Sequence, residues 1–341
     1  MKKVGCLGGT FDPIHNGHLE LAKTVRKQCG LDEIWFLPTK DTPLKSRTIS
    51  PFSTRKKMIN LAIKPYRKFK CCEIENKLPT PSYTIQTVKE LQKKYPNIEF
   101  YWIVGDDQVA QFDKWKNIDE LLSLVQFIVV PRQQFKIQDK RLWVCPTFHH
   151  EASSTAIREG SFYYLPSSVK KYALANELYL ESIVEKHCSE KRRQHVLSMT
   201  ELCVKLAIKH NVSVHEATMA GMLHDVCKEM GIDQNKKWIS LFYPSLLGVA
   251  PAIYHSFTAI PWIKQNLGYT NHRVLNAIFN HTLGLGKSKL SKIVYIADKI
   301  DPNRGYDISK QLACAMNDLD EGMELIKREQ QEYLKKEGVH V

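Results

Sequence analysis

Short apolar runs alternate with helix-forming stretches through the first half of the sequence. The apolar runs, which are typical of strands buried on both faces, lie at 4–7, 33–38, 98–104, 125–130 and 142–145. Between them, residues 17–28, 52–63 and 83–94 have the spacing of amphipathic helices. Alternation of this kind favours parallel strands joined by right-handed crossovers. We therefore predict an α/β domain with a doubly wound parallel sheet over residues 1–185.

Helical periodicity replaces this alternation from about residue 180. The helical ranges are 190–210, 215–229, 251–267, 271–281, 288–300 and 318–336. At 341 residues the chain also exceeds the usual size of a single domain. We therefore predict a second, all-α domain over residues 186–341, joined to the first without a flexible Pro/Gly linker.

Charge and cysteine content limit the partners and the compartment. The net charge of +13 suits attraction to anionic substrates, although a lysine-rich surface explains it equally well. No RNA-binding motif accompanies the charge, and no DNA partner is expected. Nine scattered cysteines without a CxxC pair suit free thiols in a reducing compartment. No apolar run approaches the roughly 20 residues of a membrane span, so we expect a cytoplasmic protein without membrane contact.

Residues 8–18 read Gly-Gly-Thr-Phe-Asp-Pro-Ile-His-Asn-Gly-His and follow the first apolar run directly. The glycines allow the backbone to approach a ligand closely. His15 and His18, three residues apart on a first helical turn, share one face of the helix. Since a helix N-terminus favours anions, the combination predicts a phosphate-binding site. A tight turn with two surface histidines would explain the glycines alone.

This stretch resembles the signature of the nucleotidylyltransferase superfamily, whose core His-x-Gly-His falls at 15–18. Its longer form resembles the bacterial nicotinate-mononucleotide adenylyltransferases. The resemblance implies a Rossmann-like fold, transfer of adenylyl from ATP to nicotinate mononucleotide with release of pyrophosphate, and Mg²⁺ bound with ATP. It assigns catalysis to His15 and His18. The ATP-binding residues that it implies are Gly8, Gly9, Thr10, Phe11, His15, His18, Gly105, Asp107, Ser154, Thr155 and Arg158.

Further motifs carry these assignments. Gly-Asp-Asp at 105–107 resembles the family's Gly-x-Asp, in which Asp107 would bind the ribose hydroxyls; a helix N-cap is the alternative. Ser-Ser-Thr-Ala-Ile-Arg at 153–158 resembles a family motif for the outer phosphates, and an N-cap with a surface arginine is the alternative. The nicotinate mononucleotide-binding residues implied by the resemblance are Asp12, Lys45, Thr84 and Trp115.

One loop departs from the family. Thr-Pro-Leu-Lys at 42–45 stands where the family usually has Pro-Pro-His-Lys, so Leu44 replaces a histidine while Lys45 keeps the charge. Trp115 could stack on the pyridine ring, and core packing is its alternative role. Adenylyl transfer to another phosphate, such as phosphopantetheine, is the alternative activity. Trp115 and Ser-Tyr-Thr at 82–84 argue against it.

Histidines and aspartates recur along the second half of the chain. His224 and Asp225 stand side by side in the apolar helical stretch 220–226, where burial is costly unless a bound metal compensates. A lone histidine on such a helix is more often a packed core residue, but the recurrence of similar residues favours a metal centre. The candidate ligands are His195, His224, Asp225, His255, His281 and Asp298.

The order His…His-Asp…Asp resembles the HD superfamily of metal-dependent phosphohydrolases. The segments 191–195, 220–228, 281–284 and 296–304 resemble bacterial HD hydrolases that cut diadenosine tetraphosphate symmetrically into two ADP. Mixed imidazole and carboxylate ligands suit iron, manganese or zinc. His255 and His281 suggest a second metal with Asp225 bridging, and the resemblance favours two iron ions with Asp225 catalytic. Candidate phosphate ligands are Arg192 or its neighbour Arg193, Lys228 and Arg304.

Two alternatives remain for the second domain. It could hydrolyse another nucleotide, or it could be a nucleotide- or RNA-binding regulatory module without turnover. The complete ligand set favours a hydrolase. The sequence does not determine the oligomeric state, and a homo-oligomer is compatible with it.

Overall fold

The computed structural model describes residues 1–40, 48–81, 83–131, 139–145, 150–305 and 307–336. The chain divides into two compact units. The first contains Met1–Ile157 and Tyr164–Tyr172, and the second contains Arg158–Tyr163 and Ala173–Val341. The division by packing therefore lies earlier in the chain than the predicted boundary between residues 185 and 186. Among the described residues, no helix has both the length and the apolar character needed to cross a membrane.

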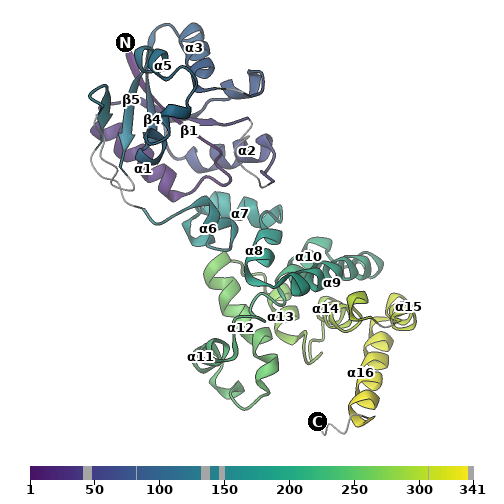
Figure 1. Ribbon diagram of the computed structural model, residues 1–341. Helices are drawn as coiled ribbons and strands as arrows, with labels where there is room; N and C mark the ends of the chain where they lie inside the picture. Colours follow the sequence, from purple (N-terminus) through teal and green to yellow (C-terminus); the bar gives the residue numbers. More distant parts are fainter. Residues whose placement is uncertain (41–47, 82, 132–138, 146–149, 306, 337–341) are drawn as a thin grey trace. The chain divides into compact units, whose positions relative to one another are not determined.

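Six parallel strands form the sheet of the first unit, in the order β3-β2-β1-β4-β5-β6 (Figure 1). They are Lys2–Gly9 (β1), Glu33–Pro38 (β2), Phe69–Cys71 (β3), Ile98–Gly105 (β4), Gln126–Val130 (β5) and Leu142–Val144 (β6). The predicted doubly wound sheet is thus confirmed. The strand order reverses between β1 and β4, which pair from Lys2 opposite Ile98 to Leu7 opposite Ile103. Ligands bind at such a reversal, beyond the carboxyl ends of the strands.

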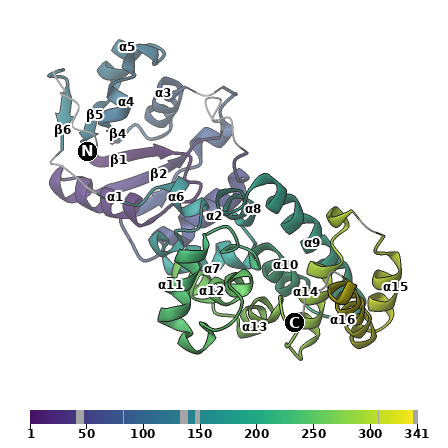
Figure 2. The ribbon, with the colours of Figure 1, turned by 60° about the horizontal axis from the view of Figure 1, so that its bottom comes forward.

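Helices cover both faces of this sheet (Figures 1 and 2). Asn16–Gln28 (α1) and Phe52–Ile63 (α2) lie on one face, and Thr84–Lys94 (α3) and Ile118–Leu124 (α5) lie on the other. Val88 of α3 and Leu121 of α5 are fully buried in one cluster with Trp102 and Phe127 of the sheet. The shorter helices are Asp106–Val109 (α4), Ser154–Arg158 (α6) and Ser167–Ala175 (α7). Strand β3 was not predicted, because its three residues stand among lysines and carry no apolar run.

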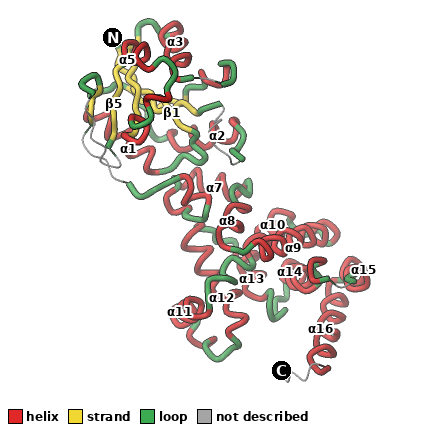
Figure 3. The backbone as a smooth tube through the Cα atoms, viewed as in Figure 1, coloured by secondary structure: helices red, strands yellow, loops and turns green. Residues whose placement is uncertain are grey.

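Helices without strands make up the described part of the second unit (Figure 3). This confirms the predicted all-α architecture. Three of the helices begin at a serine, Ser189, Ser213 or Ser288, whose hydroxyl accepts a backbone N–H of the first turn. The α-helices are Leu180–His187 (α8), Glu190–Lys209 (α9), Val214–Leu223 (α10), Ile232–Phe242 (α11), Tyr254–Trp262 (α12), His272–Asn280 (α13), Lys289–Lys299 (α14), Ser309–Asn317 (α15) and Leu319–Lys336 (α16).

Helix α10 ends earlier than the predicted helix over 215–229. Its last residue is Leu223, so His224 and Asp225 lie in the turn that follows and not within an apolar helix. Nδ1 of His224 lies 2.7 Å from the carbonyl oxygen of Gly221 and satisfies one of the free carbonyls at the helix end. The apolar pattern continues through Val226 and Cys227, and for this reason the predicted helix was too long.

Three helices of the second unit, α8, α11 and α15, were not predicted, and the last two bury few side chains. Asn235 and Ile239 are the buried residues of α11, and Ala315 is the buried residue of α15. A helix that buries so few side chains lacks the apolar stripe that marks a helix in a sequence.

The close approach of α10 to α9 gives a test of this packing. A Cβ at Gly221 would lie 2.6 Å from Oγ1 and 2.9 Å from Cα of Thr200 on α9. We expect Gly221→Ala to destabilise the second unit by about 1–3 kcal/mol, because the helix backbones must separate. Gly248→Ala is the matched control, since a Cβ there meets no atom within 4 Å. Urea unfolding followed by circular dichroism measures both, and equal midpoints would contradict the close approach.

Candidate functional sites

The loop that carries the first motif lies at the switch point of the sheet and is fixed by a buried arginine. Strand β1 ends at Gly9, and the loop then leads into α1. Arg55 of α2 donates to the carbonyl oxygens of Thr10 (2.8 Å) and Ser50 (2.9 Å). The backbone N–H of Ser50 donates to the buried carboxylate of Asp12 (3.3 Å). Arg55 of α2 and Ser50, just before α2, therefore fix the loop that leads into α1.

His15 and His18 stand together at the start of α1. Their imidazole rings stack with centroids 3.7 Å apart at 30°. The backbone N–H of His15 donates to Nδ1 of His18 (3.3 Å), which closes a capping box. Since Nδ1 of His18 accepts, the neutral ring carries its proton on Nε2. His18 therefore offers a fixed hydrogen-bond donor beside the free N–H groups of the helix start, which is a suitable arrangement for an anion.

Two other predicted segments adjoin strand ends of the first unit. Oγ of Ser154 donates to the carbonyl oxygen of Pro13 (3.0 Å), which brings α6 and its Thr155 to the motif loop. Gly105 ends β4, the neighbour of β1, and Asp107 follows in α4. Oδ2 of Asp107 accepts from the side chain of Gln108 (3.1 Å). Its buried Oδ1 has no hydrogen-bond partner among the described residues.

The predicted pyridine-binding residues are partly brought together. Trp115 is half-buried, and its ring packs against Phe112 and Phe127 with centroids 5.2 and 6.2 Å apart. Thr84 opens α3, and Nζ of Lys116 lies 4.6 Å above the ring of Tyr83, so the segments around Thr84 and Trp115 meet. Lys45 lies outside the described residues. Arg158, at the end of α6, belongs to the second unit, whereas the other residues predicted to bind ATP belong to the first.

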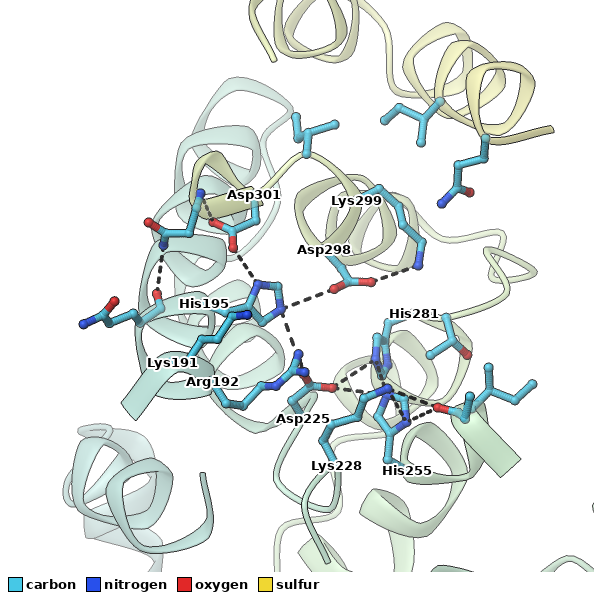
Figure 4. A pocket seen from close by; sticks show the side chains of 18 of the residues that line it. Lys191, Arg192, His195, Asp225, Lys228, His255, His281, Asp298, Lys299 and Asp301 are labelled. Carbon is cyan, nitrogen blue, oxygen red and sulfur yellow. Dashed lines mark hydrogen bonds and ion pairs between the residues drawn. The ribbon is translucent and has the colours of Figure 1, made fainter. Parts of the chain in front are cut away.

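The predicted metal ligands of the second unit gather at one cavity of about 1490 Å³ (Figure 4). His195, Asp225, His255, His281 and Asp298 line it. The sixth predicted ligand, His224, is fully buried next to them, with its Nε2 atom 3.4 Å from Nε2 of His195. Five helices, α9, α10, α12, α13 and α14, carry these residues within them or at their carboxyl ends.

Asp225 lies between two pairs of imidazoles. Its Oδ2 atom is 3.5 Å from Nε2 of His224 and 3.9 Å from Nε2 of His195. Its Oδ1 atom is 3.2 Å from Nε2 of His255 and 3.6 Å from Nε2 of His281. A carboxylate that turns one oxygen toward each pair has the arrangement of a bridging ligand between two cations. Oδ1 of Asp298, 3.3 Å from Nε2 of His195, completes the first group.

The imidazoles are held with Nε2 toward this carboxylate. In three of the rings Nδ1 lies beside a backbone carbonyl three residues earlier. Because a carbonyl oxygen only accepts, Nδ1 carries the proton and the lone pair of Nε2 is left for a cation. The pairs are His224 with Gly221 (2.7 Å), His255 with Ala252 (3.0 Å) and His281 with Ile278 (2.6 Å).

Asp301 holds the fourth imidazole and was not predicted. It is 1% exposed, and its Oδ2 atom lies 2.6 Å from Nδ1 of His195. Its Oδ1 atom accepts from the hydroxyl of Ser198 (2.6 Å) and the N–H of Asn303 (3.2 Å). A carboxylate behind a ligand histidine fixes the ring and raises its basicity. The available signal was a second aspartate in the segment Ile-Ala-Asp-Lys-Ile-Asp at 296–301.

The electrostatics of the centre keep its carboxylates ionised. Burial alone would raise the pKa of Asp225, but the surrounding His224, His255 and His281 hold that pKa well below its usual value. Burial likewise opposes ionisation of Asp298, whereas His195 and Lys299 hold its pKa well below the usual value. Burial lowers the pKa of His255 to about 4 and so keeps this ring neutral near pH 7. Burial opposes protonation of His224, but Asp225 beside it raises the pKa of this ring, so a bound metal would displace a proton there.

Cations surround the anionic centre. Nη1 of Arg192 lies 2.8 Å from Oδ2 of Asp225, and Nζ of Lys299 lies 3.0 Å from Oδ2 of Asp298. Nζ of Lys228 donates to the carbonyl oxygen of Ala252 (3.1 Å), and burial lowers the pKa of this amine. Lys191 also lines the cavity; neither it nor Lys299 was predicted. The side chain of Arg304 lies outside the described residues.

The donor atoms fit a divalent transition-metal ion. One group of atoms within 4.8 Å of one another comes from His195, His224 and Asp298, and another comes from His224, Asp225 and His281. Imidazole nitrogens with a few carboxylate oxygens are the ligands that iron, manganese and zinc take in proteins. The same set would be costly to bury without a cation.

Comparison with known proteins also distinguishes an N-terminal and a C-terminal part of the chain. The sequence matches the cytidylyltransferase-like family over residues 6–160 and the HD domain family over residues 192–303. It is 31% identical over 317 residues to the "Probable nicotinate-nucleotide adenylyltransferase/Ap4A hydrolase" of Mycoplasma genitalium, covering 89% of this chain and 88% of that protein. A protein of the same name from Mycoplasma pneumoniae is 29% identical over 334 residues, covering 92% of this chain and 94% of that protein. The "Nicotinate-nucleotide adenylyltransferase" of Bacillus subtilis is 42% identical over 187 residues, 52% of this chain and 99% of that protein.

Asp301 gives a test of the metal centre that does not depend on turnover. Asp301→Asn removes the negative charge behind His195. With the amide oxygen kept on Ser198 and Asn303, its NH₂ group faces Nδ1 of His195 and cannot accept from it. We expect the affinity for a divalent metal to fall roughly 10- to 100-fold, as for other carboxylates behind ligand histidines. Elemental analysis after dialysis against graded chelator measures the affinity. Asp233→Asn, at an exposed position of α11, is the control and is expected to keep the metal. Equal metal retention in both variants would exclude the orienting role.

Proposed function

This chain belongs to the family of two-domain nicotinate-nucleotide adenylyltransferase/Ap4A hydrolases, and we propose that it carries out both reactions named by its relatives. The first unit joins ATP and nicotinate mononucleotide to give nicotinate adenine dinucleotide and pyrophosphate. The second unit hydrolyses diadenosine tetraphosphate, Ap4A, to two ADP. Stacked His15 and His18 at the switch point carry the first proposal, and Asp225 between two imidazole pairs carries the second.

Adenylyl transfer requires no protein nucleophile. A phosphate oxygen of nicotinate mononucleotide forms the new bond to the α-phosphorus of ATP, and the bond from that phosphorus to the β-phosphate oxygen breaks, releasing pyrophosphate. The enzyme must align the reactants and neutralise the developing charge. We propose that His18 donates from Nε2 to the triphosphate, helped by the N–H groups that begin α1 and by Mg²⁺. The carboxylate of Asp107 would accept from the ribose hydroxyls, and Trp115 would stack on the pyridine ring.

Hydrolysis of a phosphoanhydride suits the second centre. We propose two divalent ions, iron in preference to manganese or zinc, with Asp225 shared between them. When bound, such ions supply Lewis acidity that activates water and neutralises phosphate charge. The chain's part is to hold the ligands, and to bind the polyphosphate through Arg192, Lys228 and Lys299. The oxygen of water forms a bond to one central phosphorus, and the bond from that phosphorus to the central bridging oxygen breaks. The bridging oxygen leaves as the terminal oxygen of the other half and takes up a proton, which gives two ADP.

We also propose that the protein works in the cytoplasm. The structure contains free cysteines at all nine positions, which suits a reducing compartment. Neither proposed reaction requires copies of the chain to associate.

His18→Ala tests the first activity. Removing one preorganised donor to transition-state charge is expected to lower the rate of nicotinate adenine dinucleotide formation by about 10²–10³-fold. Hydrolysis of Ap4A should be unchanged, because no proposed ligand of the second unit is touched. Chromatography of both product sets in one preparation measures the two rates. Loss of both activities in folded protein would contradict independent sites. If the wild-type protein is more active with phosphopantetheine than with nicotinate mononucleotide, phosphopantetheine is the acceptor.

Asp225→Asn tests the second activity in the reverse sense. Replacing the shared carboxylate by an amide removes a charge that both imidazole pairs face, so metal content and Ap4A hydrolysis should fall together while adenylyl transfer persists. A screen of dinucleoside polyphosphates and mononucleotides with added iron, manganese or zinc identifies the substrate. A wild-type protein that binds metal but hydrolyses none of them would be a regulatory module instead.

A further inference from the structure

One wall of the cavity in the second unit contains no proposed metal ligand. It is formed by the two C-terminal helices together with the residue that follows α14, Ile300. Residues 326, 330 and 333 are spaced by four and three, so they share one face of α16. The lining residues of α15 and α16 are Gln311, Ile326, Glu329, Gln330 and Tyr333.

Tyr333 presents an open aromatic ring on this wall. Its side chain lines the cavity and is 63% exposed. Among the described residues, its ring packs on no other ring and its hydroxyl makes no hydrogen bond. Ile300 and Ile326 are 1% and 4% exposed and give the wall a fixed apolar base. An aromatic ring above aliphatic side chains is the kind of platform on which a flat base stacks.

Hydrogen bonds hold the polar residues of the wall. Gln311 donates to Oε2 of Glu329 (2.8 Å), and Nζ of Lys310 lies 3.3 Å from Oε1 of the same residue. The hydroxyl of Tyr295 donates to the amide oxygen of Gln330 (3.1 Å). With its oxygen held, Gln330 keeps an amide NH₂ group as a donor on the same helix face as Tyr333. The wall thus combines a stacking surface with an oriented hydrogen-bond donor.

The position of the wall matches one end of an elongated ligand. Ile300 lies two residues beyond Asp298, so the wall adjoins the half of the centre that contains His195. A second apolar pair, Ala252 and Ile253, adjoins the other half, since the carbonyl of Ala252 accepts from His255. Cations and carboxylates occupy the region between them. A dinucleoside polyphosphate has this same order of apolar base, anionic chain and apolar base.

The size of the cavity agrees with a ligand of two nucleosides. Its volume of about 1490 Å³ exceeds the roughly 300–1,000 Å³ of most small-molecule pockets. We propose that Ile300, Ile326 and Tyr333 form a nucleoside subsite, in which the Tyr333 ring stacks on one purine base. This inference rests on the proposed hydrolase function, and it adds the residues that distinguish a nucleoside polyphosphate from polyphosphate alone.

Tyr333→Ala and Tyr333→Phe in the full, metal-loaded chain test the subsite. We expect Tyr333→Ala to raise the KM for Ap4A and to weaken inhibition by ADP by roughly five- to 100-fold, the range for loss of one base–aromatic stack. Inhibition by inorganic tripolyphosphate, kcat and metal content should stay within about twofold, because the phosphate and metal ligands are intact. Tyr333→Phe keeps the ring and should behave as wild type. Glu332→Ala, the exposed neighbour that does not line the cavity, is the matched control.

Two outcomes would overturn the subsite: an unchanged KM and ADP inhibition in Tyr333→Ala, or an equal loss for ADP and tripolyphosphate. Calorimetric titration with ADP distinguishes failure of the subsite from failure of the hydrolase proposal. Wild type and Tyr333→Ala have the same first unit, so any difference between their isotherms comes from ADP binding to the second unit. Tyr333-dependent ADP binding without any Ap4A hydrolysis would support the subsite and contradict the hydrolase. Hydrolysis with a KM independent of Tyr333 would do the reverse.

Discussion

The burial of one ionised carboxylate organises the helical unit. Asp225 is almost fully buried, and four imidazoles and the guanidinium of Arg192 stabilise its charge. Such compensation works only when every partner is oriented, because an unpaired buried charge is strongly unfavourable. Five helices must therefore bring their ends or faces to one point. Carbonyl groups at several of those helix ends then fix the imidazoles, so the fold supplies both the ligands and their orientation.

The first unit solves a related problem by other means. Its ligand is expected to be an anion, and the sheet places backbone N–H groups and two imidazoles at the switch point between β1 and β4. A buried cation beside the motif loop, Arg55 of α2, donates to backbone carbonyls and holds the loop. The two units thus recognise phosphates through different physics. Fixed dipoles serve the first, and a charged centre that fits metal ions serves the second.

Much of this arrangement follows from local sequence. Continuous apolar runs predicted five of the six strands, since strands buried on both faces need such runs; β3 carries only Phe69 as a buried residue and gave no such signal. The motif residues and the six candidate ligands could be selected because their spacing is read along the chain. Asp301 was not selected, although its segment contains a second aspartate, because its role depends on which helix carries His195 to it. The end of α10 was also missed, since Val226 and Cys227 continue the apolar pattern beyond His224 and Asp225.

The difference between the two centres bears on why one chain can hold both. In both proposed reactions a nucleotide is recognised through its phosphates, and a +13 chain offers many cations that bind phosphates without discrimination. Discrimination must therefore come from parts that contact something besides phosphate. In the first unit these are Asp107 and Trp115, which suit a ribose and a pyridine ring. In the second unit the apolar residues on either side of the Asp225 centre have the corresponding place. On the proposed functions, phosphate binding would supply affinity in both units, whereas base and sugar contacts would decide which nucleotide is turned over.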